Sequence, residues 1–138
     1  MYKFSQRSLE KLKGVDERLV EIMTIALSRS ENDFGITEGL RDIETQKRYV
    51  AEGKSQTMKS YHLRGKAVDV VIYKEKKATW DLKYYKELND LVQKIAKEKG
   101  CKITWGGSWK SLVDGPHFQI EEWWYYEWNN CFINSFWK

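Results

Sequence analysis

Residues 60–73 read SYHLRGKAVDVVIY, a turn followed by a segment in which apolar residues recur at every second position. Three branched side chains share one face of this segment: Val68, Val70 and Ile72. The alternation predicts a β-strand over 67–73 with one side in the core. Asp69 lies on the opposite face. Gly65 permits a tight turn before the strand, so the turn can fold back and bring His62 close to Asp69.

His117, the second of only two histidines in the chain, opens another short apolar segment. The only proline, Pro116, stiffens the approach to that segment, and residues 117–120 are predicted to form a strand. Two imidazoles and one carboxylate are the ligand set of a catalytic zinc ion whose fourth position is open. His62, Asp69 and His117 are therefore candidate zinc ligands, and a purely structural role for each is the alternative.

A hydrolytic metal site also needs a carboxylate that does not bind the metal, and a donor for the developing oxyanion. Asp114, three residues before His117, is placed to take a proton from water and pass it on. Arg41 follows a turn and short strand predicted over 33–37, and it is the candidate oxyanion donor. The simpler interpretations are a buried, hydrogen-bonded acid for Asp69 and a surface charge for Arg41.

Much of the remaining chain shows helical patterning. The sequence predicts three helices, over 16–29, 42–52 and 81–99. Apolar residues at helical spacing predict the first and the third, and Asp42 as a cap with Gly53 past the end predicts the second. The third has the most regular apolar stripe: Leu82, Tyr85, Leu88, Leu91, Val92 and Ile95. A further short strand is predicted over 102–105. The pattern indicates an α+β fold: a small, largely antiparallel sheet with helices packed on it and the zinc site at the sheet.

Several short motifs resemble one family of peptidases. Five residues fit the pattern SxHxxGxAxD: Ser60, His62, Gly65, Ala67 and Asp69. Together with the D-x-x-H at 114–117, they resemble the D-alanyl-D-alanine metallopeptidase family of the lysostaphin/hedgehog-like clan. The resemblance is greatest to the small L-alanyl-D-glutamate endopeptidases of phage endolysins and bacterial wall hydrolases. Three segments are similar to further parts of that family, TEGLR at 37–41, WGGSW at 105–109 and PHFQ at 116–119. The resemblance covers residues 15–120.

This resemblance implies a role for each matching residue. The zinc ligands would be His62, Asp69 and His117. Asp114 would be the general base and then the general acid, and Arg41 would hold the scissile carbonyl oxygen. Ser60 would shape the substrate site, and Ser108 and Trp109 of the WGGSW segment would contact substrate. The substrate would be a peptidoglycan stem peptide, cut between L-Ala and D-Glu by a bacteriolytic, endolysin-like hydrolase.

One position departs from the family pattern in a way that concerns specificity. Ser108 stands where these endopeptidases usually have an aspartate, although a serine hydroxyl can still accept a hydrogen bond. The change leaves open which stem-peptide bond is cut. A D-Ala-D-Ala dipeptidase or carboxypeptidase is therefore the alternative activity.

The C-terminal segment, 121–138, is a second departure, because it holds four of the seven tryptophans. Its aromatic residues recur at i, i+4 spacing, which predicts a helix. Such a helix either packs on the domain or presents an aromatic surface to a wall, a membrane or a partner. We expect a zinc peptidase domain over 1–120 and a Trp-rich extension over 121–138 that packs on the same domain.

The composition fits one small globular domain that acts as a monomer. With 138 residues, 41% hydrophobic and 32% charged, the chain is not of a disordered class, and no apolar stretch is long enough to span a bilayer. The first residues lack the apolar core of a signal peptide, so we expect a cytoplasmic enzyme that reaches the wall after release. Cys101 and Cys131 make no disulfide framework, which leaves free thiols or a single bridge.

Two other classes of protein remain as hypotheses. The first is a non-catalytic, zinc-containing binding module of the hedgehog-like kind, which Asp114 and Arg41 argue against because a site without turnover needs no base. The second is a basic protein that stacks nucleic acid on its aromatic side chains. The net charge of +4 would favour anionic surfaces in general, but the scattered charges argue against a nucleic-acid partner.

Overall fold

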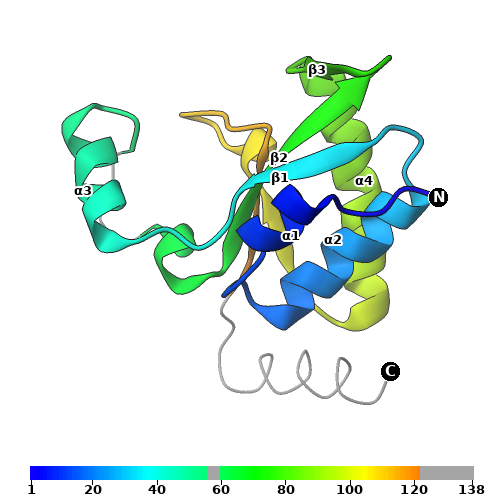
Figure 1. Ribbon diagram of the computed structural model, residues 1–138, viewed down its shortest axis with the longest axis horizontal. Coiled ribbons are helices and arrows are strands. Elements are labelled where there is room, and N and C mark those ends of the chain that lie inside the picture. The colour runs from blue at the N-terminus through cyan, green and yellow to red at the C-terminus, as the bar shows by residue number, and fades with distance from the viewer. Residues whose placement is uncertain (56–59, 122–138) are drawn as a thin grey trace.

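The computed structural model describes residues 1–55 and 60–121, and in these a twisted sheet lies against two long helices (Figure 1). The helices are α1 (Gln6–Lys11), α2 (Glu17–Arg29), α3 (Ile43–Ala51) and α4 (Leu82–Lys99), with 3-10 turns η1 (Tyr61–Arg64) and η2 (Gly106–Ser108). The strands are β1 (Phe34–Glu38), β2 (Ala67–Lys74), β3 (Lys77–Thr79), β4 (Ile103–Trp105) and β5 (His117–Ile120). The helix expected in the Trp-rich extension lies outside the described residues.

All strand pairs of the sheet are antiparallel, in the order β1-β2-β5-β4. The short strand β3 also pairs with β2, further along the strand than β5 does. The expected α+β class, with helices packed on a small antiparallel sheet, is confirmed. The pairing of β2 with β5 sets Asp69 directly opposite His117.

The core lies between one face of the sheet and the helices α2 and α4. The strand β2 contributes the three residues predicted to face inward, Val68, Val70 and Ile72, all buried. The α4 stripe is buried at Tyr85, Leu88, Val92 and Ile95. Leu82 is the exception to the predicted stripe, since it is 47% exposed. It is the first residue of α4, where the helix lies at the rim of the core.

Asp16 anchors the start of α2 to the strand that carries Asp69. Its carboxylate accepts a hydrogen bond from the backbone N–H of Arg18 (2.9 Å) and one from the Arg18 side chain (2.6 Å). Lys66, the residue before β2, donates to the same carboxylate at 2.5 Å. Burial works against the charge of Asp16, but these bonds outweigh burial and hold its pKa well below the usual range.

We expect Asp16→Asn to lower the free energy of unfolding by about 2 kcal/mol at neutral pH, because two cations lose their shared counter-ion. The depressed pKa means that the native carboxylate stabilises the fold above its unfolded pKa of about 3.9. This contribution is lost as the pH falls below that value. Urea unfolding of the wild type and of Asp16→Asn at pH 7 and pH 3 checks both points. If the two proteins differ in free energy of unfolding by the same amount at both pH values, the assignment is contradicted.

The short helix α1 was not expected from the sequence, and it closes the free edge of β1. Ser8 is buried, and its hydroxyl accepts a hydrogen bond from the backbone N–H of Ile36 (3.0 Å). An edge strand has unpaired backbone groups that need such partners. The helix therefore packs along β1, on the side of the sheet away from β4 (Figure 1).

Two further expectations concern cysteine and membranes. Cys101 is buried and disulfide-bonded and is therefore not a free thiol. Cys131 lies outside the described residues. Within 1–55 and 60–121, none of the helices has the length and apolar character needed to cross a membrane.

Candidate metal centre and active site

Three side chains that can bind a metal meet where β2, β5 and η1 come together. One donor atom from each of His62, Asp69 and His117 lies within 4.8 Å of the other two. The Nε2 atom of His62 is 3.4 Å from one oxygen of Asp69, and the Nδ1 atom of His117 is 3.3 Å from the other oxygen. The structure thus brings together the three residues that the sequence singled out as candidate ligands.

The His62 ring is held by the turn that precedes β2. The hydroxyl of Ser60 accepts a hydrogen bond from the His62 N–H (3.2 Å) and begins η1. Gly65 ends η1 with φ of 67°, a left-handed conformation that favours glycine. The ring nitrogen Nδ1 of His62 donates to the carbonyl oxygen of Gly39 at 2.8 Å. That bond leaves Nε2 of the neutral ring without a hydrogen and directed at Asp69.

The His117 ring is oriented by a chain of hydrogen bonds on the opposite side. Tyr61 and the side-chain amide of Gln119 both donate to the Glu121 carboxylate, at 2.8 and 2.9 Å. Because a carboxylate only accepts, the amide nitrogen of Gln119 faces Glu121 and its oxygen faces His117. That oxygen lies 2.8 Å from Nε2 of His117. The proton is therefore on Nε2, and the lone pair of Nδ1 is left for a metal.

The electrostatics of the cluster favour a cation between the two rings. Burial opposes the charge of Asp69, but the His117 and His62 rings, 3.3 and 3.4 Å away, outweigh burial and hold its pKa far below the usual range. Burial also works against protonation of His117, and Asp69 overcomes it and raises the pKa of that ring. The carboxylate is thus ionised, and both imidazole nitrogens that face it need a positive partner.

A metal ion fits this arrangement. The Nε2 atom of His62 is buried and has no hydrogen-bond partner among the described residues, which is costly unless something else binds it. Donor atoms at about 2.1 Å from one tetrahedral ion lie about 3.4 Å apart, close to the spacings on both sides of Asp69. The outer hydrogen bonds to Gly39 and Gln119 are of the kind that orients metal-binding histidines.

Arg41 lies beside the cluster and is held on three sides. Its Nε donates to Glu38, its Nη1 donates to Gln46 at 2.6 Å, and its backbone N–H donates to the carbonyl of His62 at 2.9 Å. Gln46 belongs to α3, which stands to one side of the sheet in Figure 1, and its side chain is fully buried. Burial works against the charge of Arg41, but Glu38 and then Asp69 outweigh it and raise its pKa.

The remaining terminal nitrogen of Arg41, Nη2, has no hydrogen-bond partner in the described part of the chain. The side chain is only 8% exposed, so its direction is fixed by its neighbours and not by solvent. A guanidinium of this kind can donate to an oxygen that develops negative charge beside the metal centre.

Asp114 is half-buried in the loop before β5 and is not one of the three clustered candidate ligands. Its backbone bonds to Gly106 and to His117 fix the loop. Burial and then the charge of Asp69 raise the pKa of its carboxyl group, against the opposing effects of His117, His62 and Arg41. A carboxylate with a raised pKa accepts and returns a proton more readily near neutral pH.

The family model for phage L-alanyl-D-glutamate peptidases matches residues 1–121. The chain belongs to this family. The match includes every residue of the cluster, together with Arg41 and Asp114. The resemblance stated from the motifs is therefore confirmed.

Relatives in this peptidase family include phage and bacterial enzymes. The chain is 44% identical over 86 residues to the L-alanyl-D-glutamate peptidase of Listeria phage A118, a match that covers 62% of this chain and 29% of that protein. It is 30% identical over 117 residues to the L-alanyl-D-glutamate peptidase of Escherichia phage T5, covering 82% and 85% of the two chains. The chain thus spans less than a third of the first relative and most of the second.

A solved member of the family has the same fold. The Serratia marcescens L-Ala D-Glu endopeptidase ChiX superposes with a TM-score of 0.81 and is 42% identical, covering 87% of this chain and 90% of that one. The two proteins match over nearly the whole described chain. They therefore share the same arrangement of sheet and surrounding helices.

Of the three residues expected to shape or contact substrate, Ser60 and Trp109 adjoin the histidines of the centre. Ser60 caps the turn that carries His62, as described above. The Trp109 ring is 5.1 Å from the His117 ring, centroid to centroid, and thus covers one side of a candidate ligand. The exposed Ser108 donates from its hydroxyl to the carbonyl of Trp105 at 2.7 Å, a local bond that stabilises η2.

The residues that orient the candidate ligands were not predicted from the sequence. Gln119 carried a signal, because it is two residues after His117 on one strand and so shares its face. Gly39, Gln46 and Glu121 carried none, because their contacts depend on how separate segments pack.

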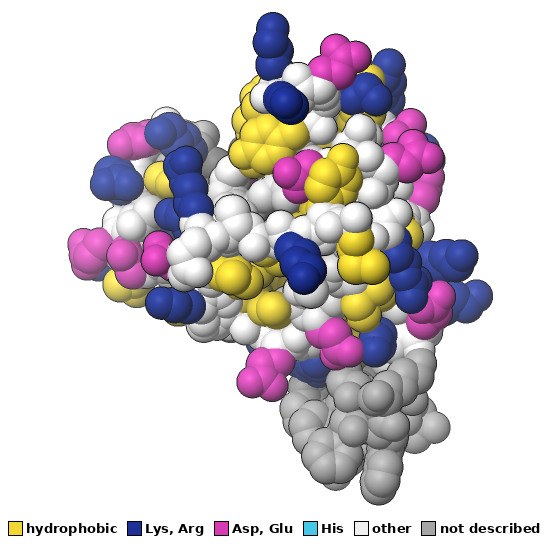
Figure 2. All heavy atoms as spheres, turned by 45° about the vertical axis from the view of Figure 1, so that its right-hand side comes forward, with side chains coloured by type: hydrophobic (Ala, Val, Ile, Leu, Met, Phe, Trp, Pro, Cys, Tyr) yellow, Lys and Arg dark blue, Asp and Glu magenta, His cyan; other side chains and the backbone are white. Residues whose placement is uncertain are grey.

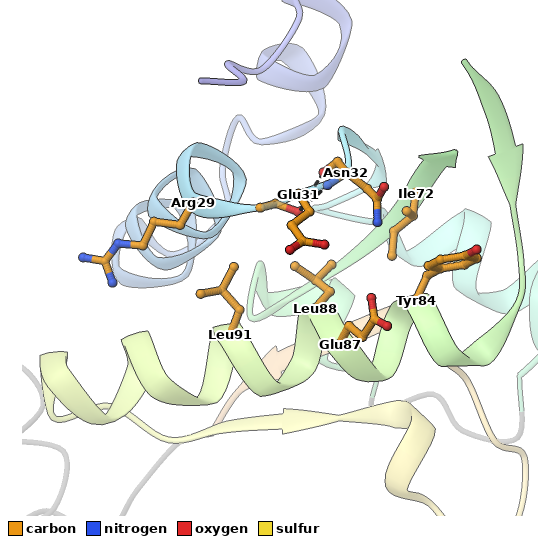
Figure 3. Close-up of a pocket in the computed structure, with 9 residues that line it drawn as sticks. Arg29, Glu31, Asn32, Ile72, Tyr84, Glu87, Leu88 and Leu91 are labelled. Carbon is orange, nitrogen blue, oxygen red and sulfur yellow. Dashed lines mark hydrogen bonds between the residues drawn. The ribbon is translucent and has the colours of Figure 1, made fainter. Parts of the chain in front are cut away.

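Another hollow, of about 370 Å³, lies between the end of α2 and α4 (Figure 3). Leu88 and Leu91 rise into it from α4, opposite Glu31 and Asn32. It opens on the helix-covered side of the sheet and has no histidine or cysteine among its lining residues, so the metal-binding chemistry is not there.

Proposed function

We propose that the protein is a zinc-dependent peptidoglycan endopeptidase that hydrolyses the L-Ala–D-Glu bond of the stem peptide. The observation that carries the proposal is the cluster of His62, Asp69 and His117 with an unpartnered, buried nitrogen on His62. The family and the activities for which its phage and bacterial relatives are named support the choice of bond.

Zinc is the metal that this ligand set suits best, since two imidazoles and a carboxylate leave a fourth tetrahedral position open. When bound, zinc supplies a Lewis acid that polarises a carbonyl and lowers the pKa of a coordinated water to about 7. The ligands proposed to hold it are His62, Asp69 and His117, with Gly39 and Gln119 orienting the two rings.

The chain's own residues then move the proton and stabilise charge. Asp114 accepts a proton from the attacking water as the water oxygen bonds to the scissile carbonyl carbon. Arg41 donates a hydrogen bond from Nη2 to the carbonyl oxygen as that oxygen becomes negative. Asp114 next gives the proton to the departing amine nitrogen, and the C–N bond breaks. Ser60, Ser108 and Trp109 are proposed to shape and line the substrate site.

We expect Arg41→Ala to lower kcat about a hundredfold while the protein still binds zinc, because one oxyanion donor is worth roughly 3 kcal/mol. Steady-state kinetics and the metal content of the purified variant check this. Because Glu38 and Gln46 lose a partner in the alanine variant, Arg41→Lys serves as the charged control for stability. Activity within twofold of the wild type would remove Arg41 from this role.

The proposed reaction is tested by digesting purified peptidoglycan with and without a chelator and analysing the fragments by mass spectrometry. New peptides with an N-terminal D-Glu, lost with chelator and restored by zinc, would establish the endopeptidase. Release of D-Ala or D-Ala-D-Ala would mean that the same site cuts a different bond of the stem peptide. That outcome would agree with the serine at position 108. A protein that holds zinc but yields no fragment from several wall types would be a binding module.

We propose that the enzyme acts on the cell wall as a monomer. Over the face drawn in Figure 2, lysines and arginines are interspersed with acidic side chains. A net charge of +4 favours the approach of the protein to an anionic wall. Gel filtration of the purified chain tests the oligomeric state.

A further inference from the structure

A basic groove of about 340 Å³ lies between α1 and the face of the sheet that α2 and α4 leave uncovered. Its rim carries three exposed cations, Lys3, Arg7 and Lys11. Thr37, Val71 and Tyr73 belong to its floor. On β2, Val71 and Tyr73 alternate with the core residues and so share the face of Asp69.

The basic groove adjoins the candidate metal centre along β2. Asp69 and Val71 are two positions apart on one strand, so their Cα atoms are about 7 Å apart. Thr37, in the floor, donates from its hydroxyl to the backbone oxygen of Asp69 at 3.3 Å. The end of α1 packs so closely on Gly39 that a Cβ there would lie 2.1 Å from the Lys11 carbonyl oxygen. Gly39 is the residue whose own carbonyl holds His62.

The charge of the basic groove is not neutralised within the protein. Among the described residues, Lys3, Arg7 and Lys11 form no ion pair, and the lining contains a single acid, Asp33. Some other cations of the described chain are paired, such as Lys66 with Asp16 and Lys99 with Glu21. Unpaired cations along a groove attract an anionic ligand and orient it.

We propose that the basic groove binds the carboxylates of the stem peptide on the side that leaves as the amine, an inference that rests on the proposed function. The L-Ala residue before the scissile bond is acylated by the sugar's lactyl group and carries no charge. The D-Glu residue after it is joined onward through its side chain, which leaves its α-carboxylate free. An extended peptide advances about 3.5 Å per residue, so the first two residues beyond the bond cover the 7 Å from Asp69 to Val71. Successive cations Arg7 and Lys11, about 6 Å apart on the helix, then face this acidic segment.

The test compares two soluble substrates, N-acetylmuramoyl-L-Ala-D-Glu-L-Lys-D-Ala and the same compound with D-isoglutamine in place of D-Glu. The variant is the double substitution Arg7→Gln, Lys11→Gln. On the acid substrate we expect KM to rise about tenfold with kcat within twofold, the pattern of a lost binding contact. On the amide substrate the wild type should show a similarly raised KM, and the variant should add little to it.

The matched control is Lys94→Gln, Lys97→Gln, which removes two exposed charges from α4 and should leave both KM values unchanged. Thermal unfolding and zinc content show that each variant is intact. An equal rise in KM on both substrates, or an equal rise in KM for the control variant, would overturn the groove assignment. The proposed endopeptidase activity would still stand. Failure of the wild type to cut either substrate would overturn the proposed function and the groove with it.

Discussion

His62→Ala should abolish tight zinc binding and lower kcat/KM by about 10⁴-fold, the largest effect expected for any single substitution in this chain. Three donor atoms meet within 4.8 Å, and removing one leaves two ligands for an ion that is normally held by three protein ligands in a catalytic site. The several kcal/mol of transition-state stabilisation that the metal supplies are lost with it. Metal analysis after dialysis and kinetics on peptidoglycan measure the two effects.

The control for His62→Ala is the wild type stripped of metal by a chelator. Added zinc should restore the stripped wild type and leave the variant inactive. Because His62 is buried, circular dichroism must show that the variant is folded. A folded variant that binds zinc as tightly as the wild type would show that His62 is a structural residue, the simpler interpretation of the sequence.

Asp114→Asn should keep zinc bound and lower kcat about 10³-fold. Asparagine fills the same space but cannot accept and return a proton, and general acid–base catalysis contributes about 10²- to 10⁴-fold. Asp114 is outside the group of three candidate ligands, so the metal content should not change. Loss of zinc in place of turnover would mean that Asp114 is a ligand and that the base lies elsewhere.

Ser111→Ala, in the exposed part of the same loop, provides a matched control for Asp114→Asn. It changes a side chain three residues away without touching a proposed proton donor or ligand. Its kcat and zinc content should equal those of the wild type. A comparable loss in this variant would trace the effect to the conformation of the loop and not to the carboxylate.

Local patterns in the sequence were sufficient for most of the elements. Asp42 and Asp81 begin helices α3 and α4, and Gly100 ends α4, as capping chemistry predicts. The alternation in β2 correctly assigned its inward face. The six-residue α1 and the three-residue β3 were missed because neither shows an apolar periodicity that can be read over so few residues.

The candidate ligands could also be named from the sequence, because His62 and Asp69 are separated by one turn and because the motifs resemble one family. What the sequence could not supply was their convergence with His117, which lies 48 residues from Asp69. That contact depends on the register of β5 against β2, and a shift of one residue would turn His117 into the core.

Local residue chemistry therefore specified the helices, the central strand, the turn at Gly65 and the identity of the candidate ligands, since these depend on neighbours along the chain. Tertiary packing alone decided which imidazole nitrogen faces Asp69, how Gln46 aims Arg41, and that α1 borders a basic groove beside the metal centre. Each of these rests on contacts between segments far apart in sequence, whose geometry exists only once the common core has formed.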